Sequence, residues 1–314
     1  MNYYINYLLY GMLFNTLSKS YNNIFIHNRI KLTICRIKGD AQIDYSSKFL
    51  NNLFIKKSSF PNINNNFIQN SKQLSSKEVS SKQSSSKESS SKPLIKIISI
   101  SPAGYKGVYT MGVCNYIKKH YNLDNYVFSG ASAGAWNALL LCYKKDSSVF
   151  KNDILHYGLN NSNNILELQL LMKKKLLENY SINDFKINKL YIGVTTLQNF
   201  HPETIIYNDF KSLEDAIDCC IASSHIPFIT GEMINKYHNL YSFDGGFSKH
   251  PYLHTKANLH ITPDIWSQNK VHNDSIFDIS LFYKNKYNFT KLYEDGYNDS
   301  HNNKKILDSV FIKH

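Results

Sequence analysis

Residues 130–134 read Gly-Ala-Ser-Ala-Gly, a G-x-S-x-G motif between a short apolar run at 126–128 and a small-residue apolar segment at 135–141. A serine on a sharp turn from strand to helix is held outward, and only small residues fit beside it, where strand and helix nearly touch. The helix that begins there directs its positive end toward negative charge at the serine. The motif therefore predicts Ser132 as a nucleophile, with Gly130 and Gly134 leaving the space that the turn needs.

Strand and helix patterns alternate along the rest of the chain. The residues at 94–100 are rich in β-branched side chains and bounded by prolines, which predicts a buried strand. Further strands are expected at 126–128, 190–195, 203–207 and 240–243, and helices at 108–119, after Ser132, at 165–179 and from a Ser212 cap to about 222. This order predicts an α/β fold with a mostly parallel sheet covered by helices on both faces.

The formal net charge of +12 comes from 36 basic residues, of which only Arg29 and Arg36 are arginine. With so much Lys, Asn, Ile and Tyr, the composition is typical of an AT-rich genome and does not indicate specific nucleic-acid binding. General attraction to an anionic bilayer surface remains compatible with the charge. The five cysteines form no C-x-x-C pair, so neither a zinc site nor a disulfide framework is predicted, and a reducing, intracellular setting is expected.

The chain is expected to divide into four parts. Residues 1–70 form an N-terminal region of unknown role, whose apolar stretch at 3–14 lacks a basic flank and is too short to span a bilayer. We therefore expect no secretory signal and no transmembrane helix, but a cytoplasmic protein compatible with peripheral membrane association. Residues 71–92 repeat a Ser/Lys pentad and predict a disordered linker. Residues 93–305 form the catalytic domain, and residues 306–314 a C-terminal tail.

Serine hydrolysis also needs donors for an oxyanion and a base for the serine proton. The turn at 102–107 lies between a strand and a helix, so backbone N–H groups near Gly104, with Lys106 close by, are candidates for the donors; a phosphate-binding or merely tight turn is the alternative. Asp244 ends a strand and precedes Gly245 and Gly246, which makes it a candidate base. A Ser-Asp-His triad is the alternative, with His250, His254 or His260 as the base.

Four motifs, in this order, resemble those of the patatin-like phospholipases, including the adiponutrin branch. They are the loop at 102–107 with its basic residue, the serine motif at 130–134, the segment at 221–227 (Ile-Ala-Ser-Ser-His-Ile-Pro) similar to A-S-x-x-x-P, and Asp-Gly-Gly at 244–246. A helical element at 292–299 is also similar to one that follows this domain. The resemblance covers roughly residues 94–305.

The resemblance implies a three-layer α/β/α patatin-like fold and a Ser–Asp dyad that works without histidine. Ser132 would attack a lipid acyl ester and Asp244 would accept its proton. Backbone groups around Ala103 and Gly104, aided by Lys106, would hold the oxyanion. The substrates would be lipids of a membrane or lipid-droplet surface, and neither a cofactor nor a metal is implied.

The chain departs from the family at the start of the loop, where Pro102 and Ala103 stand in place of glycines. Proline has no N–H to donate, so one oxyanion donor is lost if that position supplies one. Three functions stay open: hydrolysis, acyl transfer to an alcohol, and the role of a catalytically impaired protein that binds lipid surfaces or is associated with a virion. The composition and the repeat point to a large DNA virus or an AT-rich protist as the source.

Overall fold

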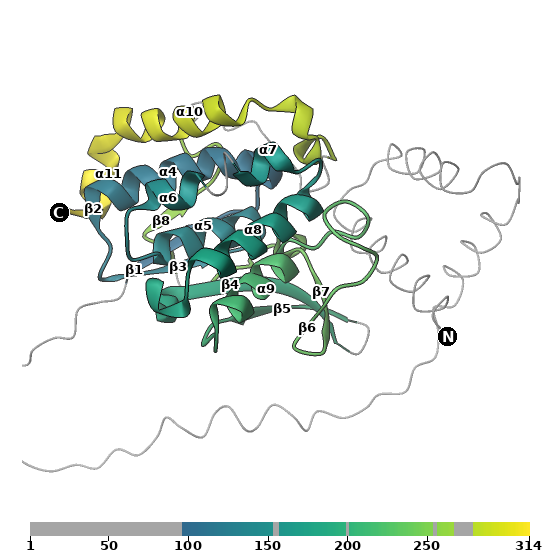
Figure 1. Ribbon diagram of the computed structural model, residues 1–314. Coiled ribbons are helices and arrows are strands. Elements are labelled where there is room, and N and C mark those ends of the chain that lie inside the picture. The colour runs from purple at the N-terminus through teal and green to yellow at the C-terminus, as the bar shows by residue number, and fades with distance from the viewer. Residues whose placement is uncertain (1–95, 153–156, 199–200, 254–255, 267–278) are drawn as a thin grey trace, which may run out of the picture. The chain divides into compact units, whose positions relative to one another are not determined.

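The computed structural model describes residues 96–152, 157–198, 201–253, 256–266 and 279–314 (Figure 1). The predicted N-terminal region, the pentad-repeat linker and His254 lie outside the described residues. The described residues fall within the predicted catalytic domain and the segment that follows it.

Strands and helices alternate through this domain. The strands are β1 (Lys96–Ile100), β2 (Tyr121–Asn122), β3 (Tyr126–Gly130), β4 (Leu190–Gln198), β5 (His201–Tyr207), β6 (Lys236–Tyr237), β7 (Leu240–Phe243), β8 (Leu259–Ile261) and β9 (Ile312–Lys313). The α-helices are α4 (Gly107–His120), α5 (Ala133–Cys142), α6 (Ser147–Lys151), α7 (Leu159–Asn161), α8 (Ile165–Asn179), α9 (Leu213–Ser223), α10 (Phe289–Asn302) and α11 (Lys304–Val310). Short 3-10 turns include η1 (Gly104–Lys106), η5 (Gly245–Phe247) and η6 (Ile279–Phe282).

The elements predicted from local sequence patterns are present. Helix α8 and strand β7 have the predicted bounds, and Ser212 caps α9 by accepting a hydrogen bond from the backbone N–H of Asp215. Strand β4 runs three residues beyond its predicted end, where it pairs with β5 and β7. Strands β6 and β8 were not predicted, because each is only two or three residues long.

Hydrogen bonds link the strands of the main sheet in the sequence β6-β7-β4-β3-β1-β8, and β5 pairs along the other edge of β4. The four adjacent strands β4, β3, β1 and β8 are parallel, whereas β5 and β7 run antiparallel to β4. Since β6 is antiparallel to β7, five of the seven strands point the same way, and the sheet is mostly parallel.

Strands β3 and β7 share one edge of β4. Ile192 of β4 pairs with β3 on one side and β5 on the other, and Thr195 pairs with β7 on one side and β5 on the other. Both β3 and β7 therefore lie opposite β5. Because β3 is parallel and β7 antiparallel to β4, their carboxyl ends face each other across Gly193 and Val194. The residues that follow β3 and β7 are thus brought together.

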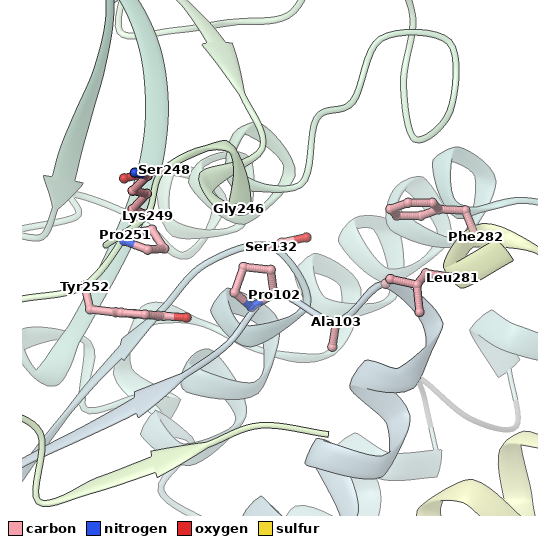
Figure 2. A pocket seen from close by; sticks show the side chains of 11 residues that line it. Pro102, Ala103, Ser132, Gly246, Ser248, Lys249, Pro251, Tyr252, Leu281 and Phe282 are labelled. Carbon is pink, nitrogen blue, oxygen red and sulfur yellow. The ribbon is translucent and has the colours of Figure 1, made fainter. Parts of the chain in front are cut away.

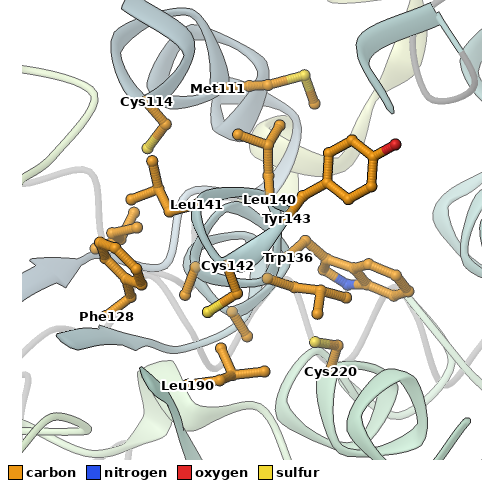
Figure 3. Packing of buried hydrophobic residues seen from close by; sticks show 14 of the residues in the cluster. Met111, Cys114, Phe128, Trp136, Leu140, Leu141, Cys142, Tyr143, Leu190 and Cys220 are labelled. Atoms are coloured by element: carbon orange, nitrogen blue, oxygen red, sulfur yellow. The ribbon is translucent and has the colours of Figure 1, made fainter. Parts of the chain in front are cut away.

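Helix α5 is the centre of the hydrophobic core. Every residue from Gly134 to Cys142 is buried, and the helix packs on β1, β3 and β4 and against α4 and α9. Figure 3 shows buried side chains on all sides of this helix, with Phe128, Leu190 and Cys220 contributed by β3, β4 and α9. A helix that is apolar all round can only be an interior helix, which explains the small-residue segment after Ser132. In Figure 1, α8 and α9 lie near α5, and α10 runs along the top of the domain next to α4.

The residues expected to form a C-terminal tail belong to the domain instead. Helix α11 buries Leu307 completely, and β9 pairs with β2. The ring of Phe311 lies 5.2 Å from the ring of Tyr121 and 5.0 Å from that of Tyr126. The prediction was wrong because the partners of this short segment lie far back in the sequence, where no local pattern indicates them.

Replacing Phe311 with alanine is therefore expected to lower the free energy of unfolding by about 3 kcal/mol, through lost burial and the cavity left behind. The neighbouring Ile312 is 63% exposed, so Ile312→Ala is the matched control and should change stability by less than about 0.5 kcal/mol. Urea titration of both variants measures the difference; equal effects would show that the C-terminal segment does not pack on β2 and β3.

Candidate active site

Ser132 stands at the turn between β3 and α5 in a strained backbone conformation, with φ 54° and ψ −128°. Non-glycine residues rarely adopt a positive φ, and such strain persists only where the surroundings impose it. The turn is tight: a Cβ on Gly134 would lie 2.2 Å from the carbonyl oxygen of Ile100, and one on Gly130 would lie 2.2 Å from the carbonyl oxygen of Gly134. The two motif glycines therefore leave the space that this turn needs, and Ser132 lies on a strand-to-helix elbow.

The backbone of Ser132 is tied to α9. Its N–H donates a 2.8 Å hydrogen bond to Ser223 Oγ, and the Ser223 hydroxyl donates in turn to the carbonyl oxygen of Gly193 at 2.6 Å. Ser223 is fully buried and belongs to the segment at 221–227 that follows the A-S-x-x-x-P pattern. This hydroxyl joins the elbow to the middle of β4, next to the point where β3 and β7 meet.

Ser223→Ala is expected to lower the free energy of unfolding by about 1–3 kcal/mol, because it leaves two buried backbone groups without a partner. Catalytic turnover should fall as well, since the strained elbow loses its support. Ser224→Ala is the matched control, because the Ser224 hydroxyl donates to the carbonyl oxygen of Cys220 within α9 and does not reach the elbow. Thermal unfolding and esterase kinetics of the two variants test this; a Ser224→Ala enzyme as impaired as Ser223→Ala would contradict it.

Asp244 follows β7 directly and is fully buried. Its N–H donates to the carbonyl oxygen of His225 at 2.7 Å, and its Oδ1 accepts a 2.7 Å hydrogen bond from the N–H of Gly246. Gly245 allows the close approach: a Cβ there would lie 2.3 Å from the Gly193 carbonyl oxygen and 2.7 Å from the Ala131 Cβ. The glycine after Asp244 therefore lets the aspartate turn pack directly against the serine elbow.

Burial raises the pKa of Asp244 to about 7, while interactions with the Ser132 side chain and the Gly246 N–H oppose the rise. Within the described residues Oδ2 has no partner at normal hydrogen-bond geometry, so the Ser132–Asp244 contact is looser than a standard hydrogen bond. Catalytic hydrogen bonds are often loose before substrate binds. A carboxylate with a pKa near 7 is well matched to take a proton at neutral pH.

A pocket of about 210 Å³ opens above the serine (Figure 2). Figure 2 shows Ser132 at its centre, with Leu281 and Phe282 on one side and Pro251 and Tyr252 on the other. Its walls combine backbone, apolar and polar groups, contributed by Pro102, Ala103, Gly104, Ser132, Gly246, Ser248, Lys249, Pro251, Tyr252, Leu281 and Phe282. The serine hydroxyl therefore faces a partly apolar cavity.

The loop predicted to hold the oxyanion reaches the same pocket. Ala103 and Gly104 line it, and Gly104 adopts φ +51° as the chain turns into η1. Gly104 also packs against Leu281, where a Cβ would lie 2.8 Å from a carbonyl oxygen. Lys106 is not among the described residues that line the pocket. The structure thus brings Ala103 and Gly104, but not Lys106, to the pocket wall beside Ser132.

The described histidines of the alternative triad do not line the pocket. His260 lies on β8, where its Nδ1 is 2.6 Å from Ser99 Oγ. His250 is exposed, and its ring contacts Tyr252 edge-on. His254 is outside the described residues. The arrangement at Ser132 favours a dyad with Asp244.

Several residues of this site were not predicted as such. Ser223 lies in the segment at 221–227, but its hydroxyl bridge depends on where α9 lies against β4. Leu281 and Phe282 follow a long stretch without a clear pattern, and Tyr252 has no motif of its own. No local signal in one sequence identifies these residues as part of the site.

The site thus combines a strained serine elbow, a buried aspartate at the end of a converging strand and a glycine-containing loop. The family model described as "Patatin-like phospholipase" matches residues 98–253, which include both Ser132 and Asp244. The predicted three-layer α/β/α class with a mostly parallel sheet is confirmed.

The chain is also similar to human PNPLA3, described as a 1-acylglycerol-3-phosphate O-acyltransferase. The two are 21% identical over 177 residues, which cover 53% of this chain and 37% of PNPLA3. The chain thus spans well under half the length of this relative. Among the described helices, none combines the length and apolar character needed to cross a bilayer.

Proposed function

We propose that this protein is a lipid acyl hydrolase in which Ser132 is the nucleophile and Asp244 the general base. The observation that supports this most is the meeting of β3 and β7 along one edge of β4. With this pairing, a buried carboxyl whose pKa is near 7 lies close to a hydroxyl on a strained elbow, and that hydroxyl lines the pocket. Histidine has no role in the proposed chemistry.

In the proposed mechanism, Ser132 Oγ attacks the acyl carbonyl carbon while Asp244 Oδ2 takes the hydroxyl proton. The oxyanion is stabilised by backbone N–H groups of Ala103 and Gly104 and by the positive end of α5. The intermediate collapses to an acyl-enzyme, and Asp244 returns its proton to the leaving alkoxide. Water then attacks the acyl group, Asp244 accepts a proton from it, and the fatty acid leaves as Ser132 regains its hydrogen.

The pocket supports a lipid substrate. Pro251, Leu281 and Phe282 provide apolar walls for an acyl chain, and Lys249 offers a cation at the rim for an anionic head group. The excess of lysine along the chain favours an anionic surface as well. We therefore propose phospholipids or acylglycerols at an intracellular membrane or lipid-droplet surface as substrates, with peripheral association.

Acyl transfer is the second candidate, and the description of PNPLA3 as an O-acyltransferase favours it. Transfer uses the same acyl-enzyme and differs only in that an alcohol replaces water. A binding protein with an impaired site is the third candidate, because Pro102 offers no N–H where glycine would.

The test is product analysis by mass spectrometry, with phospholipid and triacylglycerol vesicles supplied with and without 1-acylglycerol-3-phosphate as acceptor. Free fatty acid released by the wild type, but not by Ser132→Ala, supports hydrolysis. Diacylated acceptor formed instead supports transfer. Folded wild-type protein that forms neither product, yet sediments with vesicles, would favour the binding role.

A further inference from the structure

We propose that Tyr252 is a further catalytic residue, whose hydroxyl donates a hydrogen bond to the acyl carbonyl oxygen as that oxygen becomes negatively charged. This inference rests on the proposed function. The Tyr252 hydroxyl would replace the oxyanion donor that the backbone of Pro102 cannot supply.

Tyr252 lines the same pocket as Ser132, Pro102 and Ala103. Figure 2 shows its ring extending toward Pro102, with the hydroxyl at the near end. Pro102 is the first residue of the oxyanion loop and has no N–H, so its backbone offers no donor to the pocket. The phenol hydroxyl therefore supplies an O–H donor on the side of the pocket where proline removes one.

The backbone around Tyr252 is held in place on both sides. The N–H of Leu253 donates a 3.1 Å hydrogen bond to Ser129 Oγ, three residues before the nucleophile. Pro251 packs against β4 at Gly193, where a Cβ would lie 2.1 Å from the proline carbonyl oxygen. Tyr252 is thus anchored to β3 and β4, the strands that position the elbow, and an oxyanion donor needs such a fixed position.

The ring of Tyr252 is also oriented by its neighbours. It meets the ring of His250 edge-on at 5.7 Å and that of His260 at 5.2 Å, measured between ring centroids. These contacts fix the plane of the phenol while leaving its far end free to face the pocket.

The hydroxyl is available as a donor. No hydrogen bond from it to another described residue is present, although the ring is largely enclosed. Burial and the nearby charge of Asp244 both raise the pKa of Tyr252, so the phenol stays protonated at neutral pH. A protonated phenol with no acceptor among the described residues, in the wall of the pocket that Ser132 also lines, is suited to bind an oxyanion.

The direct test is Tyr252→Phe, which keeps the ring and removes only the oxygen. We expect kcat for the ester substrate to fall by roughly 10- to 100-fold with little change in KM, because the bond forms with the developing oxyanion. Since the hydroxyl has no acceptor among the described residues, the melting temperature should stay within about 2 °C of the wild type. Tyr283→Phe is the control: Tyr283 is 60% exposed next to the pocket-lining Phe282, and its loss of an oxygen should leave kcat unchanged.

A second variant separates oxyanion binding from other roles. Pro102→Gly restores a backbone N–H at the start of the loop, and in the Tyr252→Phe background it should recover a several-fold part of the lost kcat. Removing the hydroxyl should therefore lower kcat by a smaller factor in the Pro102→Gly background than in the wild-type background. A tyrosine with only a structural role would not show this coupling. Wild-type kcat in Tyr252→Phe, or equal losses in the two backgrounds, would overturn the inference.

Labelling of Ser132 by a fluorophosphonate, measured without lipid, distinguishes failure of this inference from failure of the proposed function. Ser132-dependent labelling and turnover in the wild type, with both undiminished in Tyr252→Phe, overturn the role of Tyr252 and leave the dyad intact. No labelling and no turnover in folded wild-type protein overturn both proposals together.

Discussion

Replacing Ser132 with alanine is expected to lower the rate of acyl ester cleavage by about 10⁴-fold or more. The proposed acyl-enzyme forms on the serine oxygen, and neither Asp244 nor the loop can supply another nucleophile. Groups that act as one unit show losses of this size when any central member is removed. Fatty-acid release at saturating substrate, followed by mass spectrometry, measures the effect.

Asp244→Asn should lose activity to a similar extent, because the amide cannot accept the serine proton. The double variant Ser132→Ala/Asp244→Asn should be no slower than the slower single variant, since each change disables the same step. Ser309→Ala is the control: that serine is exposed and its hydroxyl donates only to the carbonyl oxygen of Ile306. An Asp244→Asn enzyme with wild-type turnover would rule out the proposed base and reopen the search for a histidine.

Asp244→Asn should also raise the free energy of unfolding, by an amount that depends on pH. The pKa of Asp244 is about 7 in the folded protein and near 4 in an unfolded chain, so ionising the buried carboxyl opposes folding. A difference of about three pH units corresponds to roughly 4 kcal/mol. Asparagine carries no such charge. At pH 8, Asp244→Asn is therefore expected to be more stable than the wild type by up to roughly 4 kcal/mol, or about 10 °C in melting temperature.

The direction of the pH dependence follows from the raised pKa. The folded state binds the proton more tightly than the unfolded state, so the contribution of Asp244 to stability is fully present below about pH 4 and is lost as the pH rises to about 7. The advantage of asparagine should thus be smallest near pH 4, grow up to pH 7 and stay constant above it. Wild-type kcat/KM should rise over the upper part of this range, as Asp244 loses its proton.

Thermal melts of wild type and Asp244→Asn at about pH 4.5, 6, 7 and 8 measure this difference. Ser309→Ala, measured beside them, shows the pH dependence of the remaining groups. A constant difference between wild type and Asp244→Asn over this range would mean that Asp244 titrates with an ordinary pKa, and its proposed basicity would not hold.

Local sequence patterns predicted most of the elements because their causes are local. Helix α8 begins at Asn164, whose side chain caps it by accepting from the Glu167 N–H, and both the cap and the helical pattern can be read within one segment. The serine elbow and the Asp-Gly-Gly turn are equally compact signals. Neither motif indicates the other by itself, and only the resemblance to a family predicted that the two form one site.

The remaining features depend on the register between distant segments. That β3 and β7 share an edge of β4 follows from pairings at Ile192 and Thr195, which no local pattern specifies. The bridge through Ser223 and the packing of Phe311 on Tyr121 arise in the same way. Lys106 was predicted to belong to the oxyanion site because the family has a basic residue there. It is not among the described residues that line the pocket.

Because the carboxyl ends of β3 and β7 meet at one edge of β4, we expect the proposed pair of Ser132 and Asp244 to form late in folding. The proposed nucleophile, Ser132, is positioned by β1, β3 and α5, which are near one another in the chain. The proposed base, Asp244, reaches it only when β7, much later in the sequence, pairs with the edge of β4. Contacts of such large sequence separation are slow to form. On the proposed mechanism, a nascent or partly unfolded chain would therefore carry Ser132 without Asp244, and it would not cleave lipid esters until β7 is in place.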